Sequence, residues 1–486
     1  MVIETEVSPY LSGNYAPVRE EVEFDNLEVK GELPREMDGI YVRTGPNPQF
    51  DPLGRYHWFD GDGMLHGVRV KDGKASYRNR YVESEGYLVE KREGKAVYFG
   101  LMEMEKNFAH GKGFKNQGNT ALVWHDGQLL TLMEGSSPHA IKVPGLETLG
   151  VYTYCNKLVS AFTAHPKVDE VTGEMMFFGY NPMSAPHLQY SLVSKDGELQ
   201  WTRPIDIPRG VMIHDFAITA NYTIFMDLPL TFSMERAMKG GPVLMFEKDL
   251  PARYGIMPRY GTNSDIKWFE LPAHYVYHTS NAYEDGDEIV LHACRLPSTN
   301  VLQPAELPKN RNGDVAGADK DPMAVMYRWR FNLKTGAVKE EALDDIATDF
   351  PRVDDALVGH RYRYSYNARF TLQEPGAPPK FEGVNKYDIV TGRCETHLYG
   401  KERYGGEPVF VPRPGGAQED DGWIVTYVYD EIEGTSEMVV LDARHVSGAP
   451  IARVMIPSRV PYGFHGAWVS GERIAAQKPH EVVPTG

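Results

Sequence analysis

The chain has 486 residues and a formal net charge of −16, and hydrophobic residues make up 42% of it. This composition supports a large buried core and excludes global disorder, while the acidic balance argues against nucleic acid as a partner, because phosphate binding needs a basic surface. Its 3 cysteines, Cys155, Cys294 and Cys394, are widely spaced and form no CxxC, so neither a disulfide framework nor a thiolate metal site is expected.

The N-terminus carries no recognisable targeting signal. It is acidic, and it has neither the basic and apolar regions of a signal peptide nor the Arg/Ser bias of a transit peptide. No run of about 18 apolar residues, the length that a spanning helix needs, occurs in the chain. We therefore expect a soluble, cytoplasmic protein.

Short β-type runs separated by glycine-containing turns recur along the whole chain. Asp-Gly between such runs favours a hairpin, because type I′ turns need two residues with positive φ. No linker divides the chain, so residues 1–486 are predicted to form one all-β domain, a propeller or a large barrel, with about seven four-stranded blades of about 40–50 residues. The predicted turns are 71–74, 125–128, 171–174, 195–198, 284–287, 334–337, 390–393 and 469–472.

Residues 211–219 (VMIHDFAIT) are predicted to form a buried strand. Alternate residues of a strand share a face, so Met212, His214 and Phe216 would point one way, which sets one imidazole between two apolar side chains. Taken alone, such a histidine is most simply a core residue whose ring nitrogens bind the backbone.

Two stretches differ from this β pattern. Residues 228–246 are apolar and contain a short predicted helix at 233–239; they are either ordinary core packing or an entrance for a lipophilic substrate, and are a candidate for peripheral membrane contact. Residues 303–322 are rich in Pro, Asn, Asp and Gly, which predicts a long surface loop.

Four of the 16 histidines share one setting, which is an apolar or aromatic run followed by a small residue or a turn: His165, His214, His278 and His465. They are separated by about 50, 65 and 185 residues, which corresponds to one, one and about three blades of a propeller repeat. Side chains from separate blades converge only on the propeller axis. We therefore expect these four to bind one metal ion.

The other histidines offer weaker candidates. His274 and His278 are spaced like half of a helical HExxH zinc site, but no Glu follows His274 and the segment is β-rich, so we reject this interpretation. Five further histidines lie beside turns or charged residues and are predicted to be surface groups: His57, His66, His125, His139 and His445.

Four neutral imidazoles would leave the full charge on a divalent metal, and octahedral coordination would leave two positions free. Imidazole suits Fe, Zn, Cu and Ni, so the spacing does not identify the metal. Ligating imidazoles normally donate their second N–H to a carboxylate or carbonyl. Three acids in apolar or Gly/Pro settings are candidates for that role: Glu134, Asp349 and Glu407.

Several motifs together resemble the carotenoid cleavage oxygenases, closest to the plant-type enzymes that cleave at the 9,10 bond. The resemblance extends from about residue 14 to residue 468, nearly the whole chain. Its motifs are YVRTGPNP (41–48), FDGDGM (59–64), AHPKVD (164–169), MIHDFAIT (212–219), NAYE (281–284), DFPRV (349–353) and GFHG (463–466).

The resemblance implies an all-β, seven-bladed propeller, capped by loops and short helices that include about 228–255 and 303–322. It implies Fe(II) held by the four histidines and supported by the three acids; Asp349 is one carbon shorter than the Glu that many members have there. Thr120 matches a threonine beside the open metal positions. With O₂ as co-substrate, such an enzyme cleaves a carbon–carbon double bond into two carbonyl products, and no NAD, flavin or 2-oxoglutarate is implied.

The resemblance also bears on the substrate. Members that cleave hydroxylated stilbenes have a Lys directly before the first supporting Glu, whereas this chain has Met133 there. A tunnel without that polar group suits a polyene better than a phenol. We therefore predict oxidative cleavage of a carotenoid or apocarotenoid, in a tunnel lined by Met133, Phe108 and Phe464.

Three alternatives remain open. A stilbene- or phenylpropenoid-cleaving (isoeugenol-like) enzyme of the same family would turn over resveratrol in preference to an apocarotenal. A non-catalytic propeller that binds a ligand or a protein would contain no iron. An isomerase would give products without added oxygen. The oligomeric state is not predicted.

Overall fold

A computed structural model describes residues 8–239, 241–299, 323–371 and 377–481. Two compact units are present: residues 1–156 with 398–486, and residues 157–397. Each is described here by itself. The predicted surface loop at 303–322 lies outside the described residues, and the expectations of a single domain and of a cap stay predictions.

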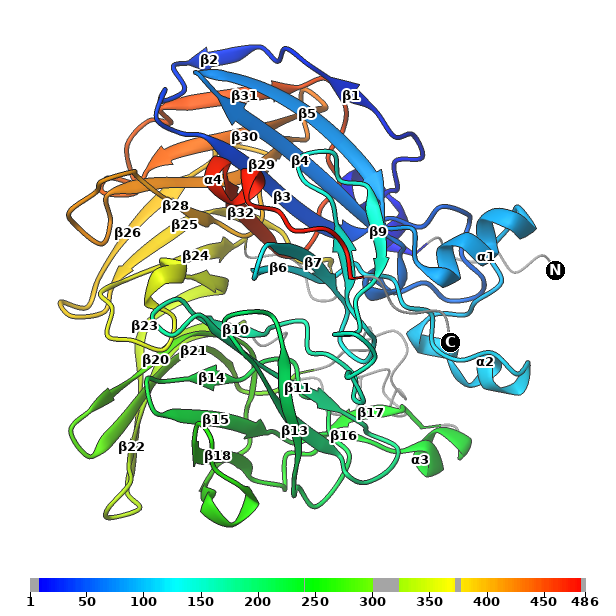
Figure 1. Ribbon diagram of the computed structural model, residues 1–486, viewed down its shortest axis with the longest axis vertical. Helices are drawn as coiled ribbons and strands as arrows, with labels where there is room; N and C mark the ends of the chain where they lie inside the picture. The colour runs from blue at the N-terminus through cyan, green and yellow to red at the C-terminus, as the bar shows by residue number, and fades with distance from the viewer. Residues whose placement is uncertain (1–7, 240, 300–322, 372–376, 482–486) are drawn as a thin grey trace, which may run out of the picture. The chain divides into compact units, whose positions relative to one another are not determined.

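The first unit contains three sheets that are made almost entirely of antiparallel neighbours (Figure 1). One sheet has the order β1 (Glu23–Phe24), β5 (Lys74–Tyr81), β4 (Gly63–Lys71), β3 (Gly39–Pro46) and β32 (Gly466–Ser470). A second has β2 (Val29–Gly31), β31 (Ala452–Ile456), β30 (Thr435–Asp442) and β29 (Gly422–Asp430), with β27 (Arg403–Tyr404) and β28 (Val409–Pro412) both paired to β29. The third runs through β6 (Ala121–His125), β7 (Gln128–Leu132), β8 (His139–Ile141) and β9 (Thr148–Val151).

Strands from the two ends of the chain complete these sheets. The C-terminal strand β32 pairs with β3, where Gly466 lies opposite Arg43, and the N-terminal strand β2 pairs with β31. Gly466 has no Cβ, and one built there would lie 2.7 Å from the Tyr41 ring. This close approach holds the segment just before β32, which carries His465, against β3.

In the second unit, the described residues form four further sheets. These are β10 (Lys167–Asp169), β11 (Glu174–Tyr180), β12 (Leu188–Val193) and β13 (Leu199–Ile205); then β14 (Ala217–Ile218), β15 (Tyr222–Asp227), β18 (Ala252–Pro258) and β19 (Lys267–Leu271). A small pair joins β16 (Leu230–Phe232) and β17 (Leu244–Phe246). The largest runs in chain order through β20 (Tyr275–Asp285), β21 (Glu288–Leu296), β22 (Val325–Asn332), β23 (Val338–Arg352), β24 (Tyr364–Phe370), β25 (Phe381–Asp388) and β26 (Arg393–Leu398).

The cores lie between neighbouring sheets of each unit. In the first unit, Tyr41 and Val68 pack with Trp423 and Val425, which joins the first sheet to the second. In the second unit, a cluster that includes Phe178, Tyr190, Phe216 and Phe225 joins the β10–β13 sheet to the β14–β19 sheet. Burial of aromatic side chains between sheets is a large favourable contribution to folding, at about 25 cal/mol per Å² of apolar surface.

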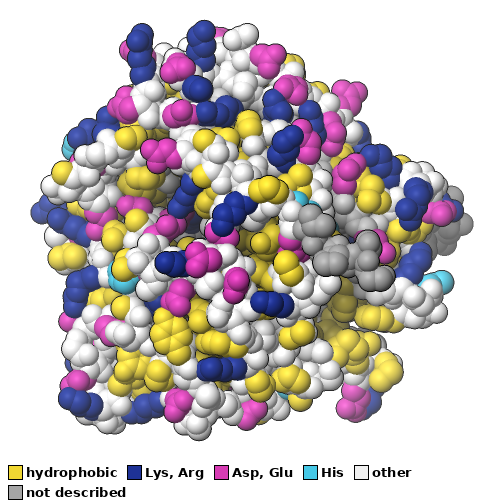
Figure 2. All heavy atoms as spheres, viewed as in Figure 1, with side chains coloured by type: hydrophobic (Ala, Val, Ile, Leu, Met, Phe, Trp, Pro, Cys, Tyr) yellow, Lys and Arg dark blue, Asp and Glu magenta, His cyan; other side chains and the backbone are white. Residues whose placement is uncertain are grey.

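Helices are few among the described residues and none is long. In that part of the chain, no helix has the length and apolar character needed to cross a membrane. On the face seen in Figure 2, basic and acidic side chains are interspersed. The helices are α1 (Glu85–Glu93), α2 (Glu105–Ala109), α3 (Met234–Met238) and α4 (Gly471–Ala475), with 3₁₀ turns η1 (Pro9–Leu11), η2 (Gly13–Tyr15), η3 (Trp58–Asp60), η4 (Leu101–Glu103), η5 (Asn263–Asp265) and η7 (Asp355–Leu357).

The predicted turns can be compared with these elements. All join consecutive strands as expected except 469–472, where β32 leads into α4. The hairpin prediction is wrong there because Ser470 is a helix N-cap, whose hydroxyl accepts a hydrogen bond from the Arg473 N–H. The helix predicted at 233–239 is confirmed as α3, with Ser233 as its N-cap.

The predicted strand at 211–219 is only partly correct. Regular pairing is limited to β14, Ala217–Ile218, and Val211 makes an isolated bridge to Thr231. Between them the backbone finds other partners: the Met212 N–H donates to the Leu230 carbonyl, and the Phe216 N–H donates to the Asp215 carboxylate. His214 therefore lies on an irregular segment that leads into an edge strand.

The prediction of surface histidines is wrong in four of five cases. His57, His66, His125 and His139 are buried, and only His445 is exposed. Charged sequence neighbours gave a misleading signal, because successive side chains of a strand point to opposite faces. His66, for example, lies within β4 and bonds the Tyr77 hydroxyl through Nδ1 at 2.7 Å.

Three buried histidines predict loss of stability in mild acid. Burial lowers the pKa of His139 and of His274 to about 4, and that of His292 to about 3. An unfolded histidine has a pKa of about 6.5, so between pH 6.5 and 4 the unfolded chain binds protons that the folded chain does not. The free energy of unfolding should therefore be greatest above pH 6.5 and fall as pH is lowered, by up to ~1.4 kcal/mol per pH unit for each histidine.

Urea unfolding at pH 7 and pH 5 measures this loss. His292 is the histidine to replace, because neither of its ring nitrogens has a hydrogen-bond partner among the described residues. In His292→Leu, the free energy of unfolding should differ less between pH 7 and pH 5 than it does in the wild type. The control His445→Leu, at an exposed site, should show the same difference as the wild type. An equal difference in all three proteins would contradict the prediction.

Candidate metal centre

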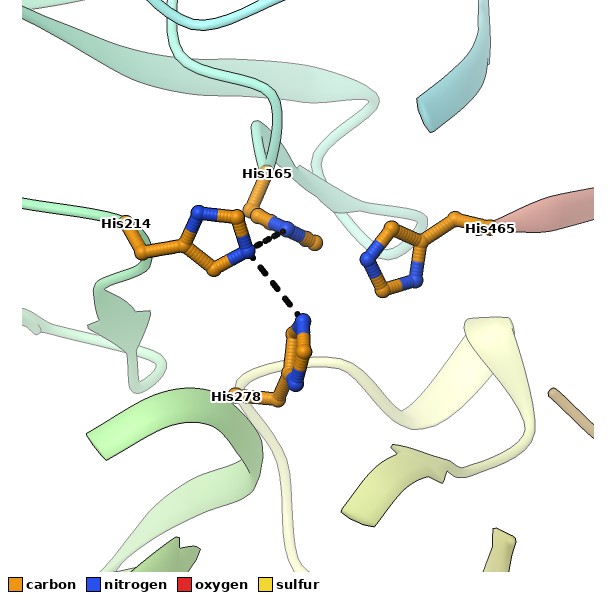
Figure 3. Close-up of side chains that lie close together, drawn as sticks. All are labelled: His165, His214, His278 and His465. Carbon is orange, nitrogen blue, oxygen red and sulfur yellow. Dashed lines mark hydrogen bonds between the residues drawn. The ribbon is translucent and has the colours of Figure 1, made fainter. Parts of the chain in front are cut away.

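Three of the predicted ligands converge in the second unit. His165 lies just before β10, His214 just before β14, and His278 within β20. The Nε2 atoms of His165 and His214 are 3.0 Å apart, and those of His214 and His278 are 3.2 Å apart. Figure 3 shows these rings with their nitrogens turned toward one another, and dashed lines mark the two approaches.

The local backbone explains how these rings leave the sheets. β10, β14 and β20 are each the edge strand of their sheet. His165 and His214 come before regular pairing begins, while the pairing of β20 with β21 shifts register on both sides of Thr279, next to His278. Irregular backbone at a sheet edge re-aims side chains that a regular strand would hold over the sheet face.

The spacing of the nitrogens fits a shared metal ion. The His214 Nε2 lies close to two other imidazole nitrogens. Each contact can be a hydrogen bond only if one nitrogen is protonated and the other is not, whereas a shared metal ion would take a lone pair from all three. Ligands at right angles around a metal, at the usual metal–nitrogen distance of about 2.1 Å, would lie about 3.0 Å apart, whereas tetrahedral ligands would lie about 3.4 Å apart. The observed 3.0 Å between His165 and His214 matches the first value, and the 3.2 Å between His214 and His278 lies midway between the two values.

His278 is oriented by a carboxylate. Its Nδ1 lies 2.9 Å from Asp349 Oδ1, which also accepts the Phe350 N–H at 2.9 Å. Both side chains are buried, and the Phe350 ring stacks on the imidazole at 4.8 Å. Phe350 has a φ of +50°, which is uncommon for a non-glycine residue and marks local strain of the kind that clusters at functional sites. The shorter Asp349 therefore does reach the ring.

In the first unit, His465 has a similar environment. Its Nδ1 lies 2.8 Å from Glu407 Oε1, and the other carboxylate oxygen accepts the Gly466 N–H at 2.7 Å. Glu407 is 2% exposed. The His465 N–H donates to the Thr120 carbonyl at 3.2 Å, which places Thr120 beside this histidine. Both carboxylate–imidazole pairs leave Nε2 as the nitrogen available to a metal.

The remaining predicted residues all lie in the first unit. Glu134 and Met133 are half-buried in the turn after β7. Phe464 is buried against Trp58, with ring centroids 4.4 Å apart, and precedes His465. Phe108 is 41% exposed on α2 and contacts Phe114 edge to face. The supporting role of Glu134 and the tunnel roles of the other three stay predictions.

A buried acid directly beside a predicted ligand escaped the sequence analysis. Asp215 follows His214 and is buried, with bonds to Lys167 and Thr279. The available signal was its position inside an apolar run, where an unpaired carboxylate would be costly. Its partners are distant in sequence, which the local pattern could not reveal.

Comparisons with known proteins agree with this geometry. Residues 15–470 match the family described as retinal pigment epithelial membrane protein. A carotenoid 9,10(9′,10′)-cleavage dioxygenase of Crocus sativus is 41% identical, over 96% of this chain and 90% of that protein.

Two solved structures are also similar. The lignostilbene dioxygenase of Pseudomonas brassicacearum superposes with a TM-score of 0.87 at 32% identity, covering 96% of this chain and 99% of that one. The cobalt-substituted apocarotenoid oxygenase of Synechocystis gives a TM-score of 0.82 at 27% identity, covering 93% and 97%. The predicted fold class, an all-β seven-bladed propeller, is confirmed by these likenesses.

Proposed function

This chain belongs to the carotenoid cleavage oxygenase family, and on that premise we propose that it uses O₂ to cleave a carbon–carbon double bond of a carotenoid or apocarotenoid, giving two carbonyl products. The observation that carries the proposal is the convergence of imidazole nitrogens at 3.0 and 3.2 Å, with a carboxylate on the outer nitrogen of His278. No other described group of His, Cys, Asp and Glu side chains offers such a set.

The proposed metal is Fe(II), held by His165, His214, His278 and His465. Four neutral imidazoles would leave a divalent ion its full charge, which suits iron among other metals. When bound, Fe(II) supplies the electrons that activate O₂ toward the alkene. Asp349 and Glu407 hold their imidazoles in the tautomer with Nε2 unprotonated, so that each ring presents a lone pair.

Aromatic side chains beside the histidines suit a long, apolar substrate. Phe350 stacks on His278, and Tyr277 lies edge-on to His214 at 5.6 Å. In the first unit, Phe464 forms an aromatic cluster with Trp58 and Phe59. Such surfaces exclude water and contact a polyene along its length, which orients the double bond without acid–base groups.

Incubation of the iron-loaded protein with one apocarotenal and with resveratrol tests the substrate class. We expect bleaching of the polyene and formation of oxygen-labelled carbonyl products under ¹⁸O₂, with little turnover of resveratrol. Turnover of resveratrol alone would support the stilbene-cleaving alternative, which the likeness to a lignostilbene dioxygenase favours. Products without added oxygen would indicate an isomerase, and absence of iron a binding protein.

The side chain at residue 133 sharpens this test. The family resemblance implies a Lys at the position of Met133 in stilbene-cleaving members, so Met133→Lys would place an ammonium group in a site that we propose is adapted to a polyene. We expect this variant to lose apocarotenal turnover by about tenfold or more, since an ammonium group at this half-buried position would lose part of its hydration when an apolar polyene lies against it. The matched variant Met133→Leu should stay within about threefold of the wild type, because a volume-conserving apolar exchange is tolerated. Equal turnover by both variants would contradict a role for this position.

A further inference from the structure

Asp215 is a buried carboxylate that neither the reaction nor the ligand set uses. Its side chain is 2% exposed, and its neighbours Ile213 and Phe216 are buried core residues. Burying an ionised carboxylate is costly unless it is paired and hydrogen-bonded. The surroundings of Asp215 must therefore supply strong partners.

Both carboxylate oxygens are fully engaged. Oδ1 lies 2.7 Å from the Lys167 ammonium and accepts the Phe216 N–H at 2.8 Å. Oδ2 accepts the Thr279 N–H at 2.7 Å and the Thr279 hydroxyl at 2.8 Å. The ammonium of Lys167 also lies over the Phe216 ring, 5.9 Å from its centroid. Charge-assisted bonds of this kind are shorter and stronger than neutral ones.

Asp215 and its two distant partners, Lys167 and Thr279, each lie beside a different histidine. Lys167 follows His165 by two residues, Asp215 is adjacent to His214, and Thr279 is adjacent to His278. The three segments lead into or belong to β10, β14 and β20, which are edge strands of three separate sheets. One carboxylate thus connects three backbone segments that are not neighbours within any sheet.

We propose that Asp215 is a positioning residue, which fixes the three histidine-bearing segments in register so that their Nε2 atoms converge before a metal binds. This inference rests on the metal site of the proposed function. The role differs from that of Asp349, which bonds an imidazole directly: Asp215 bonds Lys167, Thr279 and the Phe216 N–H, and so acts through backbone and side-chain groups next to the ligands. By ordering these segments before the metal binds, Asp215 lowers the conformational entropy that is lost on metal binding.

The chain offers a closely matched control. Asp227 pairs with Arg253 at 2.7 Å, with side-chain exposures of 3% and 18%. The Asp215–Lys167 pair has the same separation of 2.7 Å and exposures of 2% and 16%. Both pairs lie in the second unit, but the Asp227 pair joins β15 to β18 and has no histidine ligand beside it. Asp215→Asn and Asp227→Asn therefore each break a buried ion pair, and only the first would disturb the ligands.

The experiment is a Co(II) titration of the metal-free, full-length protein by calorimetry and by the visible absorption of the bound ion. Loss of a partner of the ligands typically weakens metal binding about 10–100-fold, and we expect this for Asp215→Asn. Asp227→Asn should keep the wild-type Kd, although both variants should unfold at lower urea concentration than the wild type. The Co(II) absorption of Asp215→Asn should also change in shape, since a displaced ligand alters the coordination geometry.

Each other outcome is decisive. An unchanged Kd and spectrum for Asp215→Asn would overturn the positioning role, and so would equal weakening in both variants, which would indicate a general loss of stability. A wild-type protein that binds no Co(II) would overturn the proposed metal site itself. If Asp215→Asn does not fold, Lys167→Met and Thr279→Val each remove one of the bonds; several-fold weaker Co(II) binding is expected for both, and unchanged binding would overturn the proposal.

Discussion

His214→Ala is expected to abolish metal binding and alkene cleavage. The Nε2 of His214 lies within 3.2 Å of two other candidate ligands, so this residue is the link between His165 and His278. Its loss should reduce iron content from about one per chain to background. Loss of a residue that only supports a ligand weakens metal binding or activity by up to about 100-fold, so loss of a ligand itself should lower the bleaching rate by more than that. Metal analysis of the purified protein and the rate of polyene bleaching measure both effects.

A buried histidine near the site serves as the control. His274 is fully buried four residues before His278, and it bonds the Tyr254 hydroxyl and the Pro272 carbonyl. His274→Gln should lower stability but retain about one iron per chain, because this ring is outside the proposed ligand set. Retention of iron by His214→Ala, or its loss from both variants, would contradict the assignment.

Local sequence signals predicted the strands and turns well because a hairpin depends on few residues. Asp72-Gly73 and Asp126-Gly127 have positive φ at all four residues, as the type I′ turn requires. The signal failed at Ser470-Gly471, where the same residue types begin a helix. Whether an Asp-Gly or Ser-Gly pair forms a hairpin turn or begins a helix depends on the tertiary contacts of the next few residues, and a local pattern does not contain these contacts.

The candidate site could be predicted only in part. A shared local setting identified His165, His214 and His278, and an apolar setting made Asp349 a candidate partner, which the family resemblance then supported. The irregular backbone before β14 could not be predicted, since the Leu230 carbonyl that accepts the Met212 N–H is distant in sequence and becomes visible only in three dimensions. The same holds for Asp215 and its bond to Thr279, which joins residues 64 positions apart. Pairing of buried polar groups is a non-local property, and it determined where the regular strands end.

Asp349→Ala tests whether the shorter carboxylate supports the metal as a Glu would. Asp349 accepts hydrogen bonds from the His278 ring and from the Phe350 N–H through one oxygen, so its removal frees the imidazole to rotate and to change tautomer. We expect about 10–100-fold weaker Co(II) binding and a proportionate loss of cleavage at limiting iron. Asp349→Asn retains an acceptor oxygen but not the charge, so its Kd should lie between those of the wild type and Asp349→Ala.

Asp349→Glu keeps the charge and changes only the length of the side chain. Asp349 is only 6% exposed and its carboxylate already lies 2.9 Å from the His278 Nδ1, so an extra methylene must displace Phe350 or the imidazole ring. A graded series with aspartate as the strongest binder would show that this chain is adapted to the shorter acid, whereas Asp349→Ala with wild-type affinity would show that the bond to His278 does not support the metal.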